Sequence, residues 1–267
     1  MDSENLNWSQ SRINAESGSA PSGGSAGIAV ILLLLSAVSM AMLDHHCSGY
    51  LHSHHLTGEI TNLFDAVEHF GTPYGAVLIL VSVWLCLPHL RSRVSRTLFA
   101  AITAGLMADL IKLCIARTRP TAFDFDQSIW ASFTGAFQWG AGGSRQQAFP
   151  SAHTAFAIAF AVMLGELFPQ ARRWFLGLGA MVGLQRVTTS AHFPSDVFAG
   201  AAAGWLTARC FLGTAPMGRL YDCLERHYFP DAGVSVGAVV APASRLAPAS
   251  PELNLINEAS SEPVGQH

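Results

Sequence analysis

Two histidines and a carboxylate in this sequence are of the residue types that carry out group transfer. His192 is followed four residues later by Asp196. An imidazole can attack phosphorus with one ring nitrogen if a carboxylate holds the other nitrogen and stabilises the charged ring. His153, in the segment Pro150-Ser151-Ala152-His153, is a second histidine that can protonate a departing oxygen. These residues favour phosphoryl transfer through a histidine.

Three cations accompany these groups. Lys112 is the single lysine of the chain, and Arg119 follows it by seven residues, so both side chains point along one face of a helix. Arg186 precedes His192 by six residues. Three fixed cations suit the negative charge of a phosphoryl group in its transition state, and the Ser151 hydroxyl opens a helix whose first amides bind anions well. With this much positive charge from the protein, no metal is needed.

These groups lie near the ends of apolar stretches, which must position them. Six such stretches cover residues 27–43, 73–90, 97–116, 153–168, 174–191 and 196–213. Each approaches the roughly 20 residues with which a helix crosses about 30 Å of hydrocarbon. Only 12% of the residues are charged and half are hydrophobic, whereas a soluble domain carries about 25% charged residues. The sequence therefore predicts an all-α bundle of six transmembrane helices, and its net charge of -3 indicates no nucleic-acid partner.

The chain divides into four predicted segments. Residues 27–213 form the six-span domain, with the chemistry in 97–213, and residues 214–231 form an amphipathic helix on the cytoplasmic surface. Residues 1–26 and 232–267 have the composition of disordered tails. A cleaved signal peptide would carry a basic region before its apolar stretch, but Arg12 stands there against three acids, so we expect an uncleaved first span.

The distribution of arginine predicts the orientation in the cytoplasmic membrane. With the N-terminus inside, the cytoplasmic segments hold nine arginines near the spans: Arg12, Arg91, Arg93, Arg96, Arg172, Arg173, Arg209, Arg219 and Arg226. The opposite side holds Arg117, Arg119 and Arg145. By the positive-inside rule both termini are cytoplasmic. The seven charged, hydroxyl and imidazole groups described above then meet at the outer, periplasmic face.

The three motifs resemble the signature of the type 2 phosphatidic acid phosphatase family, which shares its site with the vanadium haloperoxidases. The family pattern of lysine, six residues and Arg-Pro is similar to Lys112 through Arg119-Pro120, and Pro-Ser-Gly-His is similar to 150–153. The third pattern, Ser-Arg, five residues, His, three residues and Asp, is similar to 185–196. Ala152 stands in place of the glycine and Gln185 in place of the serine. Neither departure removes a charged or proton-transferring group.

The resemblance implies the role of each residue. His192 would be the nucleophile that forms a phosphohistidine, Asp196 its orienting partner, and His153 the general acid. The phosphate would be held by Lys112, Arg119, Ser151, Ala152 and Arg186. Bacterial membrane members of the family act without a cofactor on phosphatidate, phosphatidylglycerol phosphate, isoprenoid diphosphates or lipid A. A lipid-linked phosphotransferase of the same fold and a non-catalytic membrane scaffold are alternatives, and the oligomeric state stays open.

Each of these polar residues also has a purely structural interpretation. Lys112 can pair with Asp109 three residues earlier on the same helix. Arg186 and Asp196 can form an ion pair between the last two spans.

Four glycines in the last two spans stand at small-xxx-small spacing, which predicts close helix packing: Gly179, Gly183, Gly200 and Gly204.

Two outer loops have unusual compositions. The loop 44–72 carries a histidine-rich cluster, made of His45, His46, Cys47, His52, His54 and His55. This density of histidines suggests metal binding or pH sensing. The spacing fits no closed site, however, so a polar loop at the membrane interface is the favoured interpretation and metal binding the alternative. The loop 121–149 is rich in aromatic residues, including Trp130 and Trp139. These either form an interfacial belt or cover the path by which the lipid reaches the site.

Overall fold

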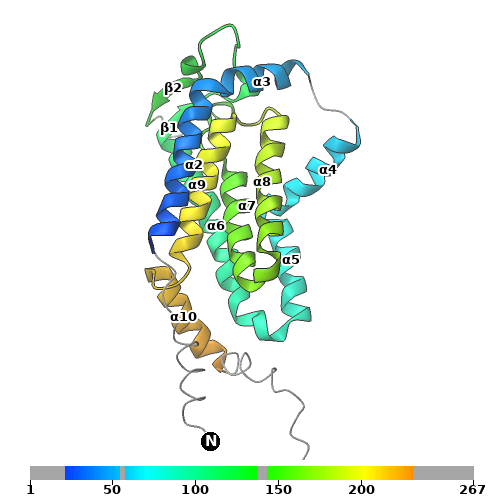
Figure 1. Cartoon of the computed structure of the whole chain (residues 1–267), viewed down its shortest axis with the longest axis vertical. Coiled ribbons are helices and arrows are strands. Elements are labelled where there is room, and N and C mark those ends of the chain that lie inside the picture. Colours follow the sequence, from blue (N-terminus) through cyan, green and yellow to red (C-terminus); the bar gives the residue numbers. More distant parts are fainter. Residues whose placement is uncertain (1–21, 55–57, 138–142, 231–267) are drawn as a thin grey trace, which may run out of the picture. The chain divides into compact units, whose positions relative to one another are not determined.

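The computed structural model describes residues 22–54, 58–137 and 143–230. These residues belong to one compact unit, which ends at Ala232. The described chain is mostly helical (Figure 1). The helices are α2 (Ser22–Met42), α3 (Asp44–Ser53), α4 (Glu59–Glu68), α5 (Pro73–Cys86), α6 (Arg91–Cys114), α7 (Ala152–Leu167), α8 (Arg172–Thr188), α9 (Pro194–Cys210) and α10 (Pro216–Tyr228).

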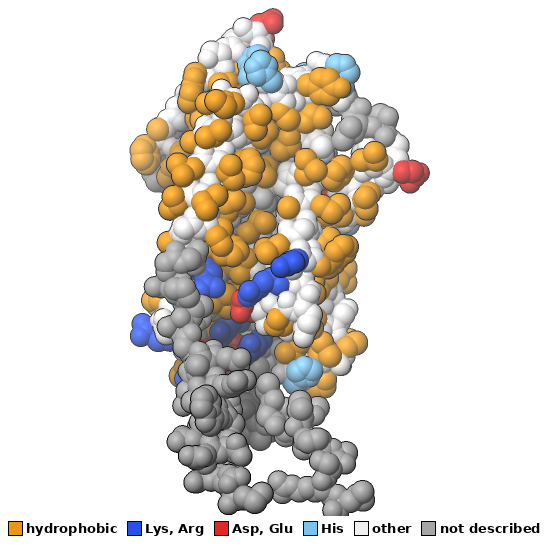
Figure 2. Space-filling model, viewed as in Figure 1, with side chains coloured by type: hydrophobic (Ala, Val, Ile, Leu, Met, Phe, Trp, Pro, Cys, Tyr) orange, Lys and Arg blue, Asp and Glu red, His pale blue; other side chains and the backbone are white. Residues whose placement is uncertain are grey.

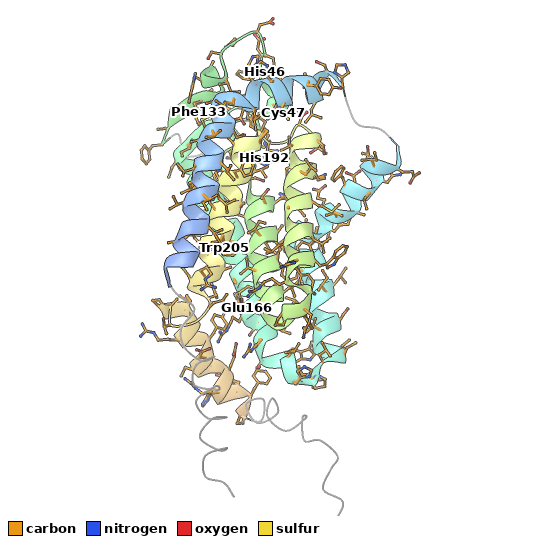
Figure 3. The ribbon with its side chains drawn as sticks, in the orientation of Figure 1. His46, Cys47, Phe133, Glu166, His192 and Trp205 are labelled. Carbon is orange, nitrogen blue, oxygen red and sulfur yellow. The ribbon has the colours of Figure 1, made fainter. Side chains whose placement is uncertain are left out.

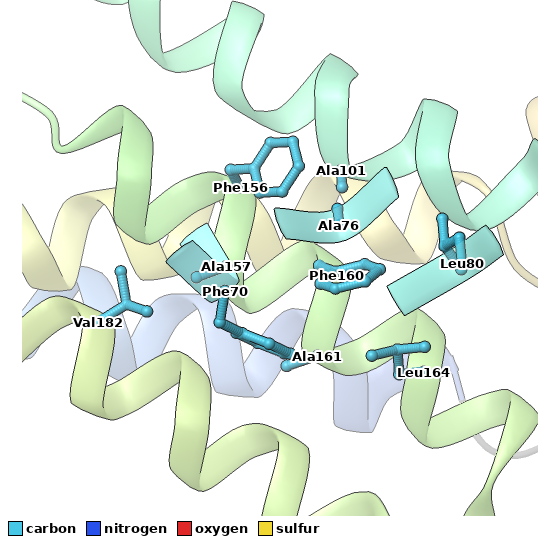
Figure 4. Packing of buried hydrophobic residues seen from close by; sticks show 10 residues of the cluster. All are labelled: Phe70, Ala76, Leu80, Ala101, Phe156, Ala157, Phe160, Ala161, Leu164 and Val182. Atoms are coloured by element: carbon cyan, nitrogen blue, oxygen red, sulfur yellow. The ribbon is translucent and has the colours of Figure 1, made fainter. Parts of the chain in front are cut away.

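Helix α7 is the centre of the bundle. It packs against α6, α8 and α9, while α2 lies along α9 and α5 lies along α6. Alanines and three phenylalanines, Phe70, Phe156 and Phe160, fill the space where α7 meets α5, α6 and α8 (Figure 4). A central helix that is apolar on all sides is the pattern of a fully surrounded core element.

The glycines predicted to mark helix contacts do so within the chain. A Cβ on Gly200 would lie 2.4 Å from the Ser151 carbonyl oxygen, and one on Gly204 would lie 2.3 Å from that of Ala155. Helix α9 thus touches the backbone of α7 along two turns. In α8, a Cβ on Gly183 would lie 2.7 Å from Val197 of α9. The contact between Gly200 and Ser151 holds the start of α9 against the start of α7, where the predicted site residues lie.

The helix ends are set by local signals. Ser151 is the N-cap of α7 and accepts a hydrogen bond from the Thr154 amide at 3.4 Å. Pro194 occupies the first turn of α9, where its missing N–H costs nothing. At the far end of the bundle, Arg96 near the start of α6 forms ion pairs with Asp222 and Glu225 of α10. These pairs hold α10 against α6.

The described helices expose a broad apolar surface. Leu34 of α2, Leu78 of α5 and Leu106 of α6 are each more than half exposed, and hydrophobic side chains cover much of the face in Figure 2. Arginine side chains on this face gather below that apolar region, toward α10. Large exposed apolar areas of this kind are expected of a protein that lies in a membrane.

Six helices correspond to the six predicted spans, but their lengths differ from the expectation. In the described part of the chain, the stretch Pro88–Cys114 is long and apolar enough to cross a bilayer by itself. Two bent pairs raise the number to three if each counts as one span: Ala26–Met42 with Asp44–Ser53, and Glu59–Gly71 with Pro73–Cys86. Helices α7, α8 and α9 have 16 or 17 residues, about 24–26 Å of rise.

The structure corrects the sequence analysis at three places. The predicted first outer loop contains helices α3 and α4, and the helix bundle carries a small antiparallel sheet of β1 (Ile115–Arg117) and β2 (Phe133–Ala136), in which Ala116 pairs with Gly135. Helix α2 begins at Ser22, within the predicted tail. The remainder of that tail and residues 231–267 lie outside the described residues. Helix α3 was missed because its sequence has no helical apolar period; its buried Asp44 is held by contacts with distant residues instead.

Candidate active site

His192 lies in the short connection between α8 and α9 with its ring buried at 2% exposure (Figure 3). Its Nδ1 is 2.7 Å from the Ala148 carbonyl oxygen and 3.7 Å from Oδ2 of Asp196. A carbonyl oxygen only accepts hydrogen bonds, so Nδ1 carries the proton and Nε2 keeps its lone pair. Burial lowers the pKa of His192, with Arg119 and Lys112 acting in the same direction and Asp196 opposing them. Burial thus favours the neutral form of the ring, with the lone pair on Nε2.

Asp196 is fully buried in the first turn of α9. Its Oδ2 accepts a hydrogen bond from the Phe193 amide at 2.8 Å, on the side that faces His192. Its Oδ1 accepts from the guanidinium of Arg117. Each carboxylate oxygen thus has its own partner, and the orientation of the carboxylate toward the imidazole is fixed.

His153 occupies the second position of α7, directly after the cap and one further residue. Its side chain is 39% exposed, and Nε2 lies 3.9 Å from Oε1 of Glu68. Arg186, His192 and Lys112 lie close enough to interact electrostatically with its ring. A partly exposed imidazole can exchange its proton with water and with a substrate oxygen, as a general acid must.

The three cations converge on the two histidines. Lys112 is largely buried and pairs with Asp109 at 2.9 Å, as its structural interpretation predicted. Arg186 does not pair with Asp196; its Nη2 contacts Glu68 at 2.6 Å and its Nε donates to Gln185 Oε1 at 2.6 Å. The pKa of Arg119 is lowered by burial and by the nearby charge of Arg186. Cations this close to one another create a site of positive potential suited to a phosphate.

The two departures from the family pattern have structural explanations. Gln185 is buried, and its amide nitrogen donates to Glu68 at 2.9 Å and to Asp65 at 3.4 Å. It therefore joins Arg186 to helix α4. Ala152 opens α7 and faces a cavity of about 200 Å³. The cavity is lined by Gly71, Pro73, Ile102, Gly105, Leu106, Asp109, Ala152, His153 and Phe156.

Ser151 is fully buried, and its Oγ accepts a hydrogen bond from the Thr154 hydroxyl at 3.0 Å. The structure thus assigns it first to capping α7. The hydroxyl proton of Ser151 stays available for an acceptor. A hydrogen bond from this hydroxyl to a phosphate therefore remains a prediction.

Two charged residues near the predicted site were missed by the sequence analysis. Glu68, at the end of α4, touches Arg186, His153 and Gln185. Arg117, in β1, is fully buried beside Asp196. A sequence signal existed for Arg117, which stands inside the first motif between Lys112 and Arg119, directly after the apolar residues 113–116.

The described part of the histidine-rich cluster contacts backbone carbonyl groups. Among the described residues, no group of three or more histidine, cysteine and acidic side chains is arranged to hold a metal ion. Most of the cluster lies on α3, where Nε2 of His45 contacts the Phe125 carbonyl at 2.9 Å and Nδ1 of His54 contacts that of Tyr50 at 3.1 Å. His55 lies outside the described residues.

Comparison with known proteins confirms the resemblance that the three motifs predicted. Residues 93–220, which contain all three motifs, match the PAP2 superfamily. The lipid A 1-phosphatase of Rhizobium johnstonii is 35% identical over 125 residues, which are 46% of this chain and 48% of that protein. The lipid A 1-phosphatase of Rhizobium etli is 33% identical over 138 residues, 49% of this chain and 56% of that protein.

The chain thus spans about half the length of the curated relatives it matches. A crystal structure of a transmembrane PAP2 type phosphatidylglycerolphosphate phosphatase from Bacillus subtilis has a TM-score of 0.46 and 15% identity to this chain. That comparison covers 76% of this chain and 96% of the other.

Proposed function

We propose that this protein is an integral membrane lipid phosphatase that works through a phosphohistidine on His192. The observation that carries the proposal is the hydrogen bond from His192 Nδ1 to the Ala148 carbonyl, with Asp196 behind it. This arrangement leaves Nε2 free to attack in the neighbourhood of Lys112 and Arg119. The carbonyl and carboxylate then stabilise the positive charge that the ring gains in the transition state.

The reaction has two steps. Nε2 of His192 attacks phosphorus while the bond from phosphorus to the lipid oxygen breaks, and His153 gives its proton to that oxygen. The cations, Lys112, Arg119 and Arg186, hold the phosphoryl oxygens throughout. His153 then takes a proton from a water molecule, whose oxygen attacks the phosphohistidine and releases inorganic phosphate. No metal is required, because the protein provides the positive charge.

The substrate is a phosphomonoester or diphosphate of a membrane lipid. The cavity beside His153 is lined by apolar side chains such as Ile102, Leu106 and Phe156. An apolar cavity that adjoins the general acid suits the hydrocarbon part of a lipid. Lipid A that carries a 1-phosphate is the first candidate, because that group is named in the two rhizobial relatives. Phosphatidate, phosphatidylglycerol phosphate and isoprenoid diphosphates share the same phosphate chemistry.

The bundle spans the cytoplasmic membrane with six helices and faces the periplasm with its active site. The apolar surface of the described helices and the arginines near α10 support this orientation. Helices of 16 or 17 residues cross the hydrocarbon where the bilayer adapts to them. The amphipathic helix α10 then lies on the cytoplasmic surface, where basic side chains meet anionic lipid headgroups.

Phosphate release tests this function directly. Detergent-purified protein is given phosphatidate, phosphatidylglycerol phosphate, undecaprenyl diphosphate and lipid A, each with and without a chelator. We expect chelator-resistant release that His192→Ala abolishes and that Arg172→Lys, in the first turn of α8 and far from His192, leaves unchanged. Phosphate from labelled substrate should remain on the protein in an acid-labile, base-stable form after rapid denaturation. A folded wild-type protein that releases no phosphate from any lipid would exclude the hydrolase, and a newly phosphorylated acceptor would identify a transferase.

A further inference from the structure

Arg117 is the largest fully buried side chain of the described residues. Its guanidinium donates from Nε to Ser132 Oγ at 3.1 Å, from Nη1 to Ser195 Oγ at 2.7 Å, and from Nη2 to Asp44 Oδ2 at 2.7 Å. Nη1 also donates to Oδ1 of Asp196. Four of its five N–H groups are thus used, which fixes the guanidinium in both position and plane.

Two aromatic rings enclose the same guanidinium. Its carbon lies 4.2 Å from the centre of the Phe193 ring and 4.6 Å from that of Phe133. Both rings exclude water from the ion pairs with Asp44 and Asp196, so these pairs act at a low effective dielectric constant. A charge imbalance in such a place has large effects on neighbouring groups.

Asp44 is the second carboxylate of this buried cluster and comes from α3. Its Oδ1 accepts from the Ser195 amide at 2.9 Å and from Ser39 Oγ at 3.2 Å, and its Oδ2 faces Arg117. Asp44 and Arg117 neutralise each other, so the net charge of the three groups is -1 and belongs to Asp196. Without Asp44, the guanidinium would cancel the charge with which Asp196 holds His192.

We propose that Arg117 and Asp44 are positioning residues for the reaction: Arg117 fixes Oδ1 of Asp196, and Asp44 offsets the positive charge of Arg117. Asp196 then keeps both its orientation and its charge for His192. This inference rests on the proposed function, because it assigns a purpose to the carboxylate behind the nucleophile. It also gives α3 a role, since that helix supplies the offsetting charge from 73 residues away in the sequence.

A buried ion-pair cluster that served stability alone would leave His192 unaffected once the protein is folded. The test therefore follows the His192 titration in folded variants. The charged and titratable groups that face His192 are Asp196 of α9, Lys112 of α6, Arg119 after β1, and His153 of α7, with Arg186 of α8 beside His153. None of these groups is substituted in the variants, so a change of titration belongs to the Asp44 and Arg117 pair.

Three variants separate charge from position. Asp44→Asn changes the net charge of the cluster from -1 to 0. Arg117→Lys keeps every charge but loses the planar guanidinium and its set of hydrogen bonds. Asp44→Asn with Arg117→Gln returns the net charge to -1, again without the guanidinium. Arg172→Lys and Glu166→Gln, an ion pair at the far end of α7, are the matched controls. Folding is checked for each variant by thermal unfolding and gel filtration in detergent.

His192 is followed by ¹⁵N NMR of histidine-labelled protein, assigned by His192→Ala, and by the acid limb of kcat/KM. In Asp44→Asn we expect both to move to lower pH, since an imidazolium is less stabilised when Asp196 is neutralised by Arg117. The double variant should recover the wild-type titration but not the rate. We expect kcat to fall about 100-fold in Arg117→Lys and in the double variant, as for an active-site group displaced by ~1 Å.

A folded Asp44→Asn protein with the wild-type His192 titration would overturn the proposal, as would a folded double variant with wild-type kcat. If Asp44→Asn does not fold, Arg117→Lys decides, because its charge balance is intact and only the position of Asp196 changes. Failure of the proposed function is a different result: the wild type would release no phosphate from any lipid, while the NMR titration would still show whether Asp44 and Arg117 control His192.

Discussion

Glu68 forms an ion pair with Arg186, with 2.6 Å between Oε1 and Nη2. The glutamate comes from α4 and the arginine from the last turn of α8, so the contact joins the predicted first outer loop to the predicted phosphate site. A carboxylate and a phosphate cannot both bind the same guanidinium without repulsion. The phosphate must therefore displace Glu68 or bind beside it.

Replacing this carboxylate should strengthen phosphate binding. For Glu68→Gln we expect the inhibition constant of inorganic phosphate to fall about fivefold, the equivalent of ~1 kcal/mol for a partly exposed ion pair. The measurement is product inhibition of lipid hydrolysis at fixed pH. Asp65→Asn is the control, because Asp65 contacts the same Gln185 at 3.4 Å but, among the described residues, forms no ion pair with Arg186. An inhibition constant that stays equal or rises in Glu68→Gln would contradict this interpretation.

The contact between α9 and α7 should tolerate no side chain at Gly200. A Cβ there would lie 2.4 Å from the Ser151 carbonyl, so Gly200→Ala must push the start of α7 away from α9. We expect a loss of about 1–3 kcal/mol in stability, together with a lower kcat, because His153 moves with α7. Gly177→Ala, on an open face of α8 with no atom within 4 Å of the added Cβ, should be neutral or slightly stabilising. Thermal unfolding in detergent compares the two, and equal midpoints would disprove the close contact.

The pH dependence should report the neutral state of His192. Its pKa is lowered by burial, and attack requires the unprotonated ring, so activity is retained above that pKa and lost as the pH falls through it. We therefore expect the acid limb of kcat/KM below the ordinary histidine value of about 6.5. The acid limb could also reflect protonation of the substrate phosphate. Two substrates whose phosphates differ in pKa separate these causes, because a limb that belongs to His192 has the same midpoint with both. An enzyme limb above that value would show that Asp196 outweighs burial.

Trp130 should affect long-chain lipids selectively if the aromatic loop covers the path to the site. Its side chain is 60% exposed in the short helical turn Ile129–Ser132. Trp130→Ala is expected to raise KM for a long-chain substrate about tenfold and to leave a short soluble phosphate ester unaffected. Trp174→Ala is the control, because the Trp174 side chain is 66% exposed in the first turn of α8, at the end opposite to Arg186. Equal losses on both substrates would favour the interfacial belt; Trp139, the second residue of this hypothesis, lies outside the described residues.

The sequence alone was sufficient for the parts of the protein that local patterns encode. Continuous apolar runs predicted six helices, because a long apolar run can satisfy its backbone in lipid only as a helix. The spacing within three motifs predicted that His192, Asp196 and His153 share a site with Lys112, Arg119 and Arg186, and the resemblance to the PAP2 family followed from those residues. It also predicted that Gly200 and Gly204 lie at helix contacts.

Tertiary structure decided which charges touch each other. The partners of Arg117 lie 73 and 79 residues away in the sequence, and nothing in the local pattern of 113–119 distinguishes a buried guanidinium from an interfacial one. Helix α3 likewise has no apolar period of its own and owes its place to the burial of Asp44. A charged side chain is stable in the interior only when it forms ion pairs with opposite charges, and which ion pairs form depends on how the helices pack. The residues of the predicted site were therefore visible in the sequence, whereas the charge balance behind His192 was visible only in the fold.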